Sequence, residues 1–135
     1  MQAEAANDAK AKTILVVEDD LVNGLVLFDF LKAQGYRPLL ARTGPDGVAT
    51  FDKERPDLVI CDVLLPRQNG FQVCFEIRRM PHGARTPVLL MSAVYRDQPS
   101  AEQYARNDLQ AQGYLVKPFE LSDLLARVRE LVGAA

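Results

Sequence analysis

The chain has 135 residues and a mass of 15.0 kDa, the size of one ordinary domain. Its 48% of hydrophobic and 25% of charged residues are typical of a globular protein. The formal net charge of −2 argues against non-specific nucleic-acid binding and polybasic membrane attachment, because both need a basic surface. The sequence shows no apolar run near the roughly 18 residues of a membrane span, and residues 1–12 lack the apolar core of a secretory signal.

The cysteines and the histidine limit the chemistry further. Cys61 and Cys74 lie in apolar stretches and do not form a disulfide framework, so we expect reduced thiols in a cytoplasmic protein. His82 is the only histidine. A zinc site built from histidines and cysteines is therefore not expected.

Residues 1–12 show no periodic pattern, and we interpret them as a flexible tail before one domain at 13–132. Apolar runs of strand length then alternate with amphipathic stretches of helix length. In chain order we predict a strand at 14–17, a helix at 21–34, a strand at 36–41, a helix at 43–53, a strand at 57–61, a helix at 71–79, a strand at 87–91, a helix at 98–110, a strand at 113–116 and a helix at 121–131. Gly35 is placed to end the first helix, and Pro38 puts the second strand near a sheet edge.

Alternating strands and helices predict an α/β fold, a parallel sheet with helices on both faces. In such sheets the functional site lies outside the carboxyl ends of the strands. The residues at those ends are Glu18, Asp19 and Asp20, then Asp62, Ser92 and Lys117.

These strand ends combine carboxylates, a hydroxyl and an ammonium group. Carboxylates from the first and third strands repel each other unless a cation neutralises them, and Mg²⁺ is the divalent ion that prefers oxygen ligands. Ser92 and Lys117 suit the oxygens of a transferred phosphoryl group. The combination therefore indicates phosphoryl transfer onto an aspartate. Asp20 alone is as well explained as a helix cap.

From Thr13 to about Val132 the chain resembles the receiver domains of two-component response regulators, the CheY-like family. The order and spacing of four motifs carry the resemblance. They are Ile14-Leu15-Val16-Val17-Glu18-Asp19-Asp20, then Asp62-Val63-Leu64-Leu65-Pro66 with Asn69-Gly70, then Met91-Ser92-Ala93, and Lys117-Pro118-Phe119. The resemblance implies a flavodoxin-like five-stranded sheet in the order 2-1-3-4-5.

The resemblance also implies roles for single residues. Asp62 would be the phosphoacceptor. Asp19, Asp62 and the backbone carbonyl of Leu64 would bind Mg²⁺, with Glu18 acting through a metal-bound water.

Further roles concern the phosphorylated state. Lys117 would bind a phosphoryl oxygen, and the Lys117-Pro118 peptide would be cis. Ser92 would move to hydrogen-bond the phosphoryl group, and Tyr114 would change rotamer with it. This change would alter the face formed by the fourth helix, the fifth strand and the last helix.

The implied function is a signalling switch rather than an enzyme. It would receive its phosphoryl group from a sensor histidine kinase or a phosphotransfer protein and regulate a downstream protein or a fused output domain. No helix pair is left over to read DNA, so direct nucleic-acid binding is not expected, nor is membrane binding.

Three other functions fit less well. A pseudo-receiver that binds partners without phosphorylation usually lacks one of the acidic, hydroxyl or lysine residues that this chain has. A flavodoxin-like cofactor binder needs a Ser/Thr/Gly-rich phosphate loop after the first strand, where this chain has acids. A phosphatase with an aspartyl nucleophile would place that residue after the first strand and needs a cap domain.

Two departures from the family pattern stand out. Gln110 lies where a glycine usually begins the approach to the last strand. Leu64 and Val94 occupy the positions that flank the path of the hydrolytic water, and apolar side chains neither orient nor attract water. We therefore expect a long-lived phosphorylated form, although the two side chains could instead simply pack together.

Overall fold

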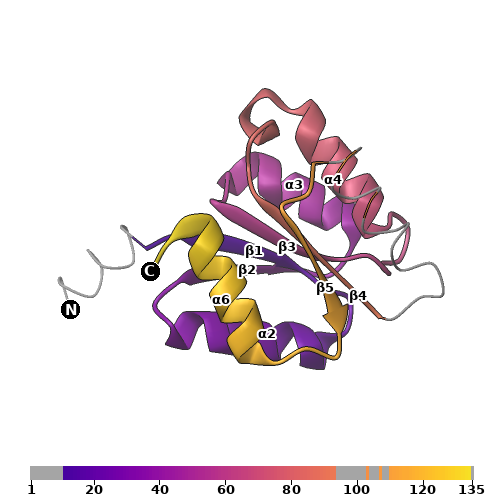
Figure 1. Ribbon diagram of the computed structural model, residues 1–135. Coiled ribbons are helices and arrows are strands. Elements are labelled where there is room, and N and C mark those ends of the chain that lie inside the picture. Colours follow the sequence, from indigo (N-terminus) through magenta and orange to yellow (C-terminus); the bar gives the residue numbers. More distant parts are fainter. Residues whose placement is uncertain (1–10, 94–102, 104–106, 108–109, 135) are drawn as a thin grey trace.

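The computed structural model describes residues 11–93, 103, 107 and 110–134, which form a five-stranded parallel sheet covered by helices (Figure 1). The strands are β1 (Thr13–Val17), β2 (Arg37–Ala41), β3 (Leu58–Asp62), β4 (Val88–Ala93) and β5 (Gly113–Lys117). The helices are α2 (Leu21–Ala33), α3 (Gly44–Glu54), α4 (Gly70–Arg79) and α6 (Leu121–Val132), with a short 3-10 helix η1 (Pro81–Gly83). The strand order β2-β1-β3-β4-β5 confirms the predicted fold.

Two predicted segments fall largely outside this description. They are the tail at 1–12 and the helix at 98–110. Among the described residues, none of the helices combines the length and the apolar character needed to cross a bilayer.

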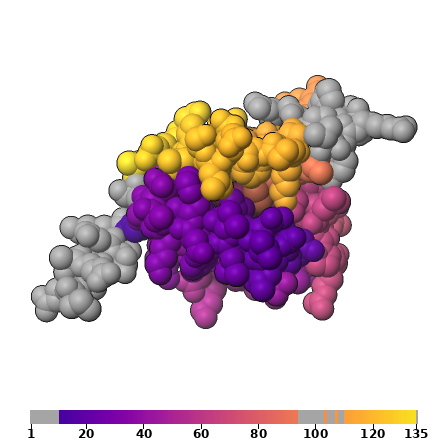
Figure 2. Space-filling model, turned by 90° about the horizontal axis from the view of Figure 1, so that it is seen from below, coloured from indigo at the N-terminus to yellow at the C-terminus, as the bar shows by residue number. Residues whose placement is uncertain are grey.

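The sheet is buried on both faces, which explains its continuous apolar strands. Helices α2 and α6 lie side by side on one face, and α3 and α4 cover the other (Figures 1 and 2). Along β1, Ile14 packs toward the α2 and α6 side, whereas the next residue, Leu15, packs toward α3 and α4. Cys61 and Cys74 are free thiols in this second core, and burial raises the pKa of both.

Strands β3, β4 and β5 extend further at their carboxyl ends than predicted. Strand β4 continues to Ala93, two residues beyond the predicted end, while Asp62 and Lys117 are the last residues of β3 and β5. The cause is pairing with neighbouring strands, because Asp62 lies opposite Met91 and Ala93 opposite Lys117. The chemical groups at this edge are therefore held by the sheet.

Helix caps shape the loops that follow the strands. Asp20 is the N-cap of α2, and its carboxylate accepts hydrogen bonds from the backbone N–H groups of Val22 (2.9 Å) and Asn23 (3.2 Å). Asn69 begins α4 through a reciprocal capping box with Gln72. Both helices therefore start directly beside the sheet edge that carries the acidic residues.

Arg78 joins the segments that lead into β4 and β5, at the amino ends of these strands. Its guanidinium donates to the carbonyl oxygens of Gly83 (2.8 Å), Thr86 (2.7 Å) and Gln110 (3.1 Å), and to Oε1 of Gln112 (3.0 Å). Gln110 has a left-handed backbone with φ of 55°, a conformation that glycine adopts more readily than glutamine. The chain thus enters β5 along a path fixed by Arg78.

Candidate functional site

Three carboxylates meet where β1 and β3 end. Glu18 and Asp19 follow β1, Asp62 ends the neighbouring β3, and one oxygen from each lies within 4.8 Å of the others. Glu18 and Asp62 are 1% and 6% exposed, whereas Asp19 is exposed. Three oxygen ligands at this spacing, with one side open, can hold a hard divalent cation. The predicted convergence of these residues is confirmed.

Lys117 reaches this cluster from β5. Its Nζ donates to Glu18 Oε1 and to Asp62 Oδ2, both at 2.9 Å. The two acids thus share one ammonium group, which compensates part of their repulsion. The backbone N–H of Leu64 also donates to Asp62 Oδ1 at 3.2 Å.

The electrostatics of the cluster follow from burial and pairing. Burial raises the pKa of Glu18 above 4.5, and the hydrogen bond from Lys117 only partly opposes this. Burial lowers the pKa of Lys117, but its hydrogen bonds to Asp62 and Glu18 outweigh burial and raise that pKa above 10.5. Lys117 therefore stays charged at neutral pH.

The switch candidates lie on the neighbouring strands. Ser92 on β4 is fully buried, and its hydroxyl has no hydrogen-bond partner among the described residues. Tyr114 on β5 is also buried, opposite Leu90 of β4. The Lys117-Pro118 peptide is cis, as expected. Val94 lies outside the described residues.

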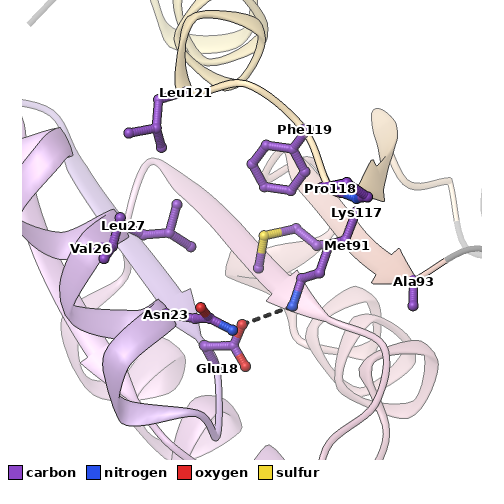
Figure 3. A pocket seen from close by; sticks show the side chains of 10 residues that line it. All are labelled: Glu18, Asn23, Val26, Leu27, Met91, Ala93, Lys117, Pro118, Phe119 and Leu121. Carbon is purple, nitrogen blue, oxygen red and sulfur yellow. Dashed lines mark hydrogen bonds and ion pairs between the residues drawn. The ribbon is translucent and has the colours of Figure 1, made fainter.

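An apolar pocket of about 570 Å³ adjoins the acidic cluster on the side of α2 and α6. Figure 3 shows Glu18 and Lys117 meeting at one end of it, and Leu27, Met91 and Phe119 along its apolar side. The carboxylate of Glu18 and the ammonium of Lys117 therefore form the polar end of an otherwise largely apolar pocket.

Arg42 lies at the site although it was not predicted from the sequence as a site residue. This arginine follows β2, and its Nη2 donates to the backbone carbonyl oxygen of Asp19 at 3.2 Å. The rule that directs attention to strand ends would have found it, because β2 ends at the same edge of the sheet as β1.

Comparison with known proteins places the chain in a family. Residues 14–129 match the response regulator receiver domain family. The chain is 40% identical over 119 residues to the response regulator MprA of Mycolicibacterium vanbaalenii, which covers 88% of this chain and 49% of MprA. The chain thus spans about half the length of the curated relatives that it matches.

Solved structures agree with this match. The chemotaxis protein CheY4 of Vibrio cholerae has a TM-score of 0.84 at 27% identity, covering 90% of this chain and 99% of CheY4. The receiver domain of the sensor histidine kinase PA1611 from Pseudomonas aeruginosa has a TM-score of 0.75 at 29% identity, covering 92% of this chain and 99% of that domain. That structure has a magnesium ion coordinated in its active site cleft. The chain therefore belongs to the family of response regulator receiver domains of two-component signalling.

Proposed function

We propose that this chain is a phosphorylation-controlled switch whose phosphoacceptor is Asp62. The observation that carries the proposal is the meeting of three carboxylates with Lys117 at the carboxyl edge of the sheet. An oxygen of Asp62 forms a bond to phosphorus while the bond to the donor atom breaks, which leaves an acyl phosphate. The ammonium of Lys117 then moves from the carboxylate to a phosphoryl oxygen.

The acidic residues present fit Mg²⁺. Asp19 and Asp62 would hold the ion directly with the backbone carbonyl of Leu64, and Glu18 would act through a water molecule. Carboxylate and carbonyl oxygens are the ligands that this ion takes in proteins. When bound, Mg²⁺ supplies positive charge that lets a negative phosphoryl group approach the acids.

The response to phosphorylation would begin at Ser92. Its buried hydroxyl has no partner among the described residues, so a phosphoryl oxygen on Asp62 can satisfy it. A shift of Ser92 would be followed by Tyr114 and would alter the surface formed by β5 and α6. The predicted helix at 98–110, which would share this surface, lies largely outside the described residues. A downstream protein or an output domain would read this surface.

The outer face of α2 suits the protein that donates the phosphoryl group. Leu21, Val22, Leu25 and Val26 are between 44% and 70% exposed, an unusual apolar content for the outside of a helix. This face begins beside the acidic cluster, where a donor must approach. We propose that a histidine kinase or phosphotransfer protein covers it during transfer.

The direct test is intact mass after incubation with acetyl phosphate and Mg²⁺. We expect one phosphoryl adduct, which is lost when Mg²⁺ is omitted and in Asp62→Asn. The exposed Asp29→Asn on α2 is a matched control that should be labelled like the parent protein.

The alternative is a pseudo-receiver that acts unmodified. Failure of the parent protein to bind Mg²⁺ or to accept phosphate, from acetyl phosphate or from a histidine kinase, would favour it. An adduct retained in Asp62→Asn would show that Asp62 is not the acceptor.

The lifetime of the phosphorylated form is a further prediction. Leu64 is 59% exposed and follows Asp62 by two residues, so its apolar side chain offers no group that would orient a hydrolytic water. We expect Leu64→Asn to speed the loss of phosphate from Asp62 about fivefold, because an amide can position that water. Loss of the adduct followed by mass over time measures this rate, with Leu64→Met as the apolar control. An equal rate in both variants would contradict the prediction.

A further inference from the structure

Two cationic side chains flank the acidic cluster, one from each of the two outer strands of the sheet. The acids stand on the inner strands β1 and β3, Lys117 on the outer strand β5, and Arg42 directly after the outer strand β2. The backbone N–H of Glu18 donates to the Ala41 carbonyl at 3.0 Å, which fixes the ends of β1 and β2 side by side. Arg42 is therefore placed at the cluster by the sheet.

The two cations contact the cluster in different ways. Lys117 lies between the carboxylates of Glu18 and Asp62, where its ammonium compensates one of their two negative charges by direct contact. Arg42 donates to the backbone carbonyl of Asp19 and is exposed to solvent. Its charge thus acts on the cluster through space.

We propose that the positive charge of Arg42 assists phosphoryl transfer, because it draws the anionic phosphoryl donor to the site, and that the same charge weakens the binding of Mg²⁺. This inference rests on the proposed function. The three carboxylates carry a formal charge of −3, and Lys117 reduces it to −2. A divalent cation brings the site to neutrality, so the positive charge of Arg42 is what remains to attract a dianion.

A purely structural role of Arg42 predicts the opposite change in Mg²⁺ affinity when the arginine is replaced. If Arg42 only held the Asp19 backbone in place, its loss would loosen Asp19 and weaken both Mg²⁺ binding and labelling. If its charge acts as proposed, its loss strengthens Mg²⁺ binding and slows labelling by an anionic donor. The two measurements together therefore separate the roles.

The test uses Arg42→Gln at low ionic strength. We expect calorimetry to show Mg²⁺ bound about threefold more tightly, the size of effect given by one charge several ångströms away in water. Labelling by acetyl phosphate, followed by intact mass at saturating Mg²⁺ for each protein, should slow about threefold for the same reason. Both differences should shrink in 0.5 M KCl, roughly the range where screening lengths fall to a few ångströms.

Two variants serve as controls. Arg42→Lys keeps the charge and should stay close to the parent protein in both measurements. Arg85→Gln removes an exposed arginine before β4, at the opposite edge of the sheet, and should change neither.

The outcomes are distinguishable. Weaker or unchanged Mg²⁺ binding in Arg42→Gln, beside a parent protein that binds Mg²⁺ and is labelled, overturns the role of Arg42 alone. A parent protein that neither binds Mg²⁺ nor accepts phosphate overturns the proposed function and this inference with it.

Discussion

Lys117→Met should lower the free energy of unfolding at pH 7 by about 2–3 kcal/mol in the absence of Mg²⁺. The substitution keeps the volume of the side chain but leaves the carboxylates of Glu18 and Asp62 without their ammonium partner. Removing one member of a fully buried pair costs roughly 3–5 kcal/mol. We expect less here because the Lys117 side chain is 27% exposed.

The loss should depend on pH and on Mg²⁺. The pKa of Glu18 is already raised by burial and would rise further without Lys117, so the native state binds a proton more tightly than the unfolded state. Stability therefore falls as the pH rises above about 4.5, and the deficit should be smaller at pH 5 than at pH 7. We expect Mg²⁺ to restore part of this loss, because an ion held by the three carboxylates as proposed would bind the native state and not the unfolded chain.

Urea unfolding followed by circular dichroism measures both effects. Lys32→Met removes an exposed lysine from the last turn of α2 and is the control, with an expected loss below about 0.5 kcal/mol. A loss in Lys117→Met that is the same at both pH values, or no larger than that of the control, would show that the shared ammonium does not stabilise the cluster.

Gly70→Ala is the second substitution with a large expected effect, about 3 kcal/mol. A Cβ atom at position 70 would overlap the backbone oxygen of Asp62 and lie 2.8 Å from the Cα of Val63. Both neighbours are backbone, so the start of α4 and the end of β3 must move apart. The move would displace Asp62 itself, and Mg²⁺ binding should weaken together with stability.

Gly24→Ala is the matched control inside α2. Its added Cβ would meet the Leu40 side chain at 3.0 Å, and the end of that side chain can shift. Alanine also favours the helix by about 1 kcal/mol over glycine, so the net change should stay within about 1 kcal/mol. Thermal unfolding should therefore show a fall of about 10 °C for Gly70→Ala and little change for Gly24→Ala. Equal falls in the two variants would contradict the steric argument.

The sequence pattern was sufficient to predict the sheet and the edge that carries the acids. Apolar runs such as 14–17 are recognisable because a strand buried on both faces has no polar alternation. The ends of β3 and β4 were harder to predict, since Asp62 and Ser92 are polar and join the strands only through pairing with their neighbours.

Other features depend on three-dimensional detail. That Lys117 contacts both Glu18 and Asp62 depends on the conformation of a long side chain, for which sequence holds no periodic signal. Arg42 was missed for a different reason. It stands at a strand end, where the strand-end rule applies, but an exposed arginine after an edge strand resembles any solvated residue. The role of Arg78 was equally hidden, as its four acceptors are scattered between Gly83 and Gln112.

The Arg78 network sets a boundary for any motion that starts at Ser92. Moving Gln110 or Gln112 would break hydrogen bonds to a guanidinium. Both bonds are solvent-exposed, so each contributes up to about 1 kcal/mol. We therefore expect Gln110 and Gln112 to keep their positions when Asp62 is phosphorylated. The start of β5 would then keep its position on phosphorylation. A partner protein bound there would keep those contacts while its contacts near the phosphorylated Asp62 changed.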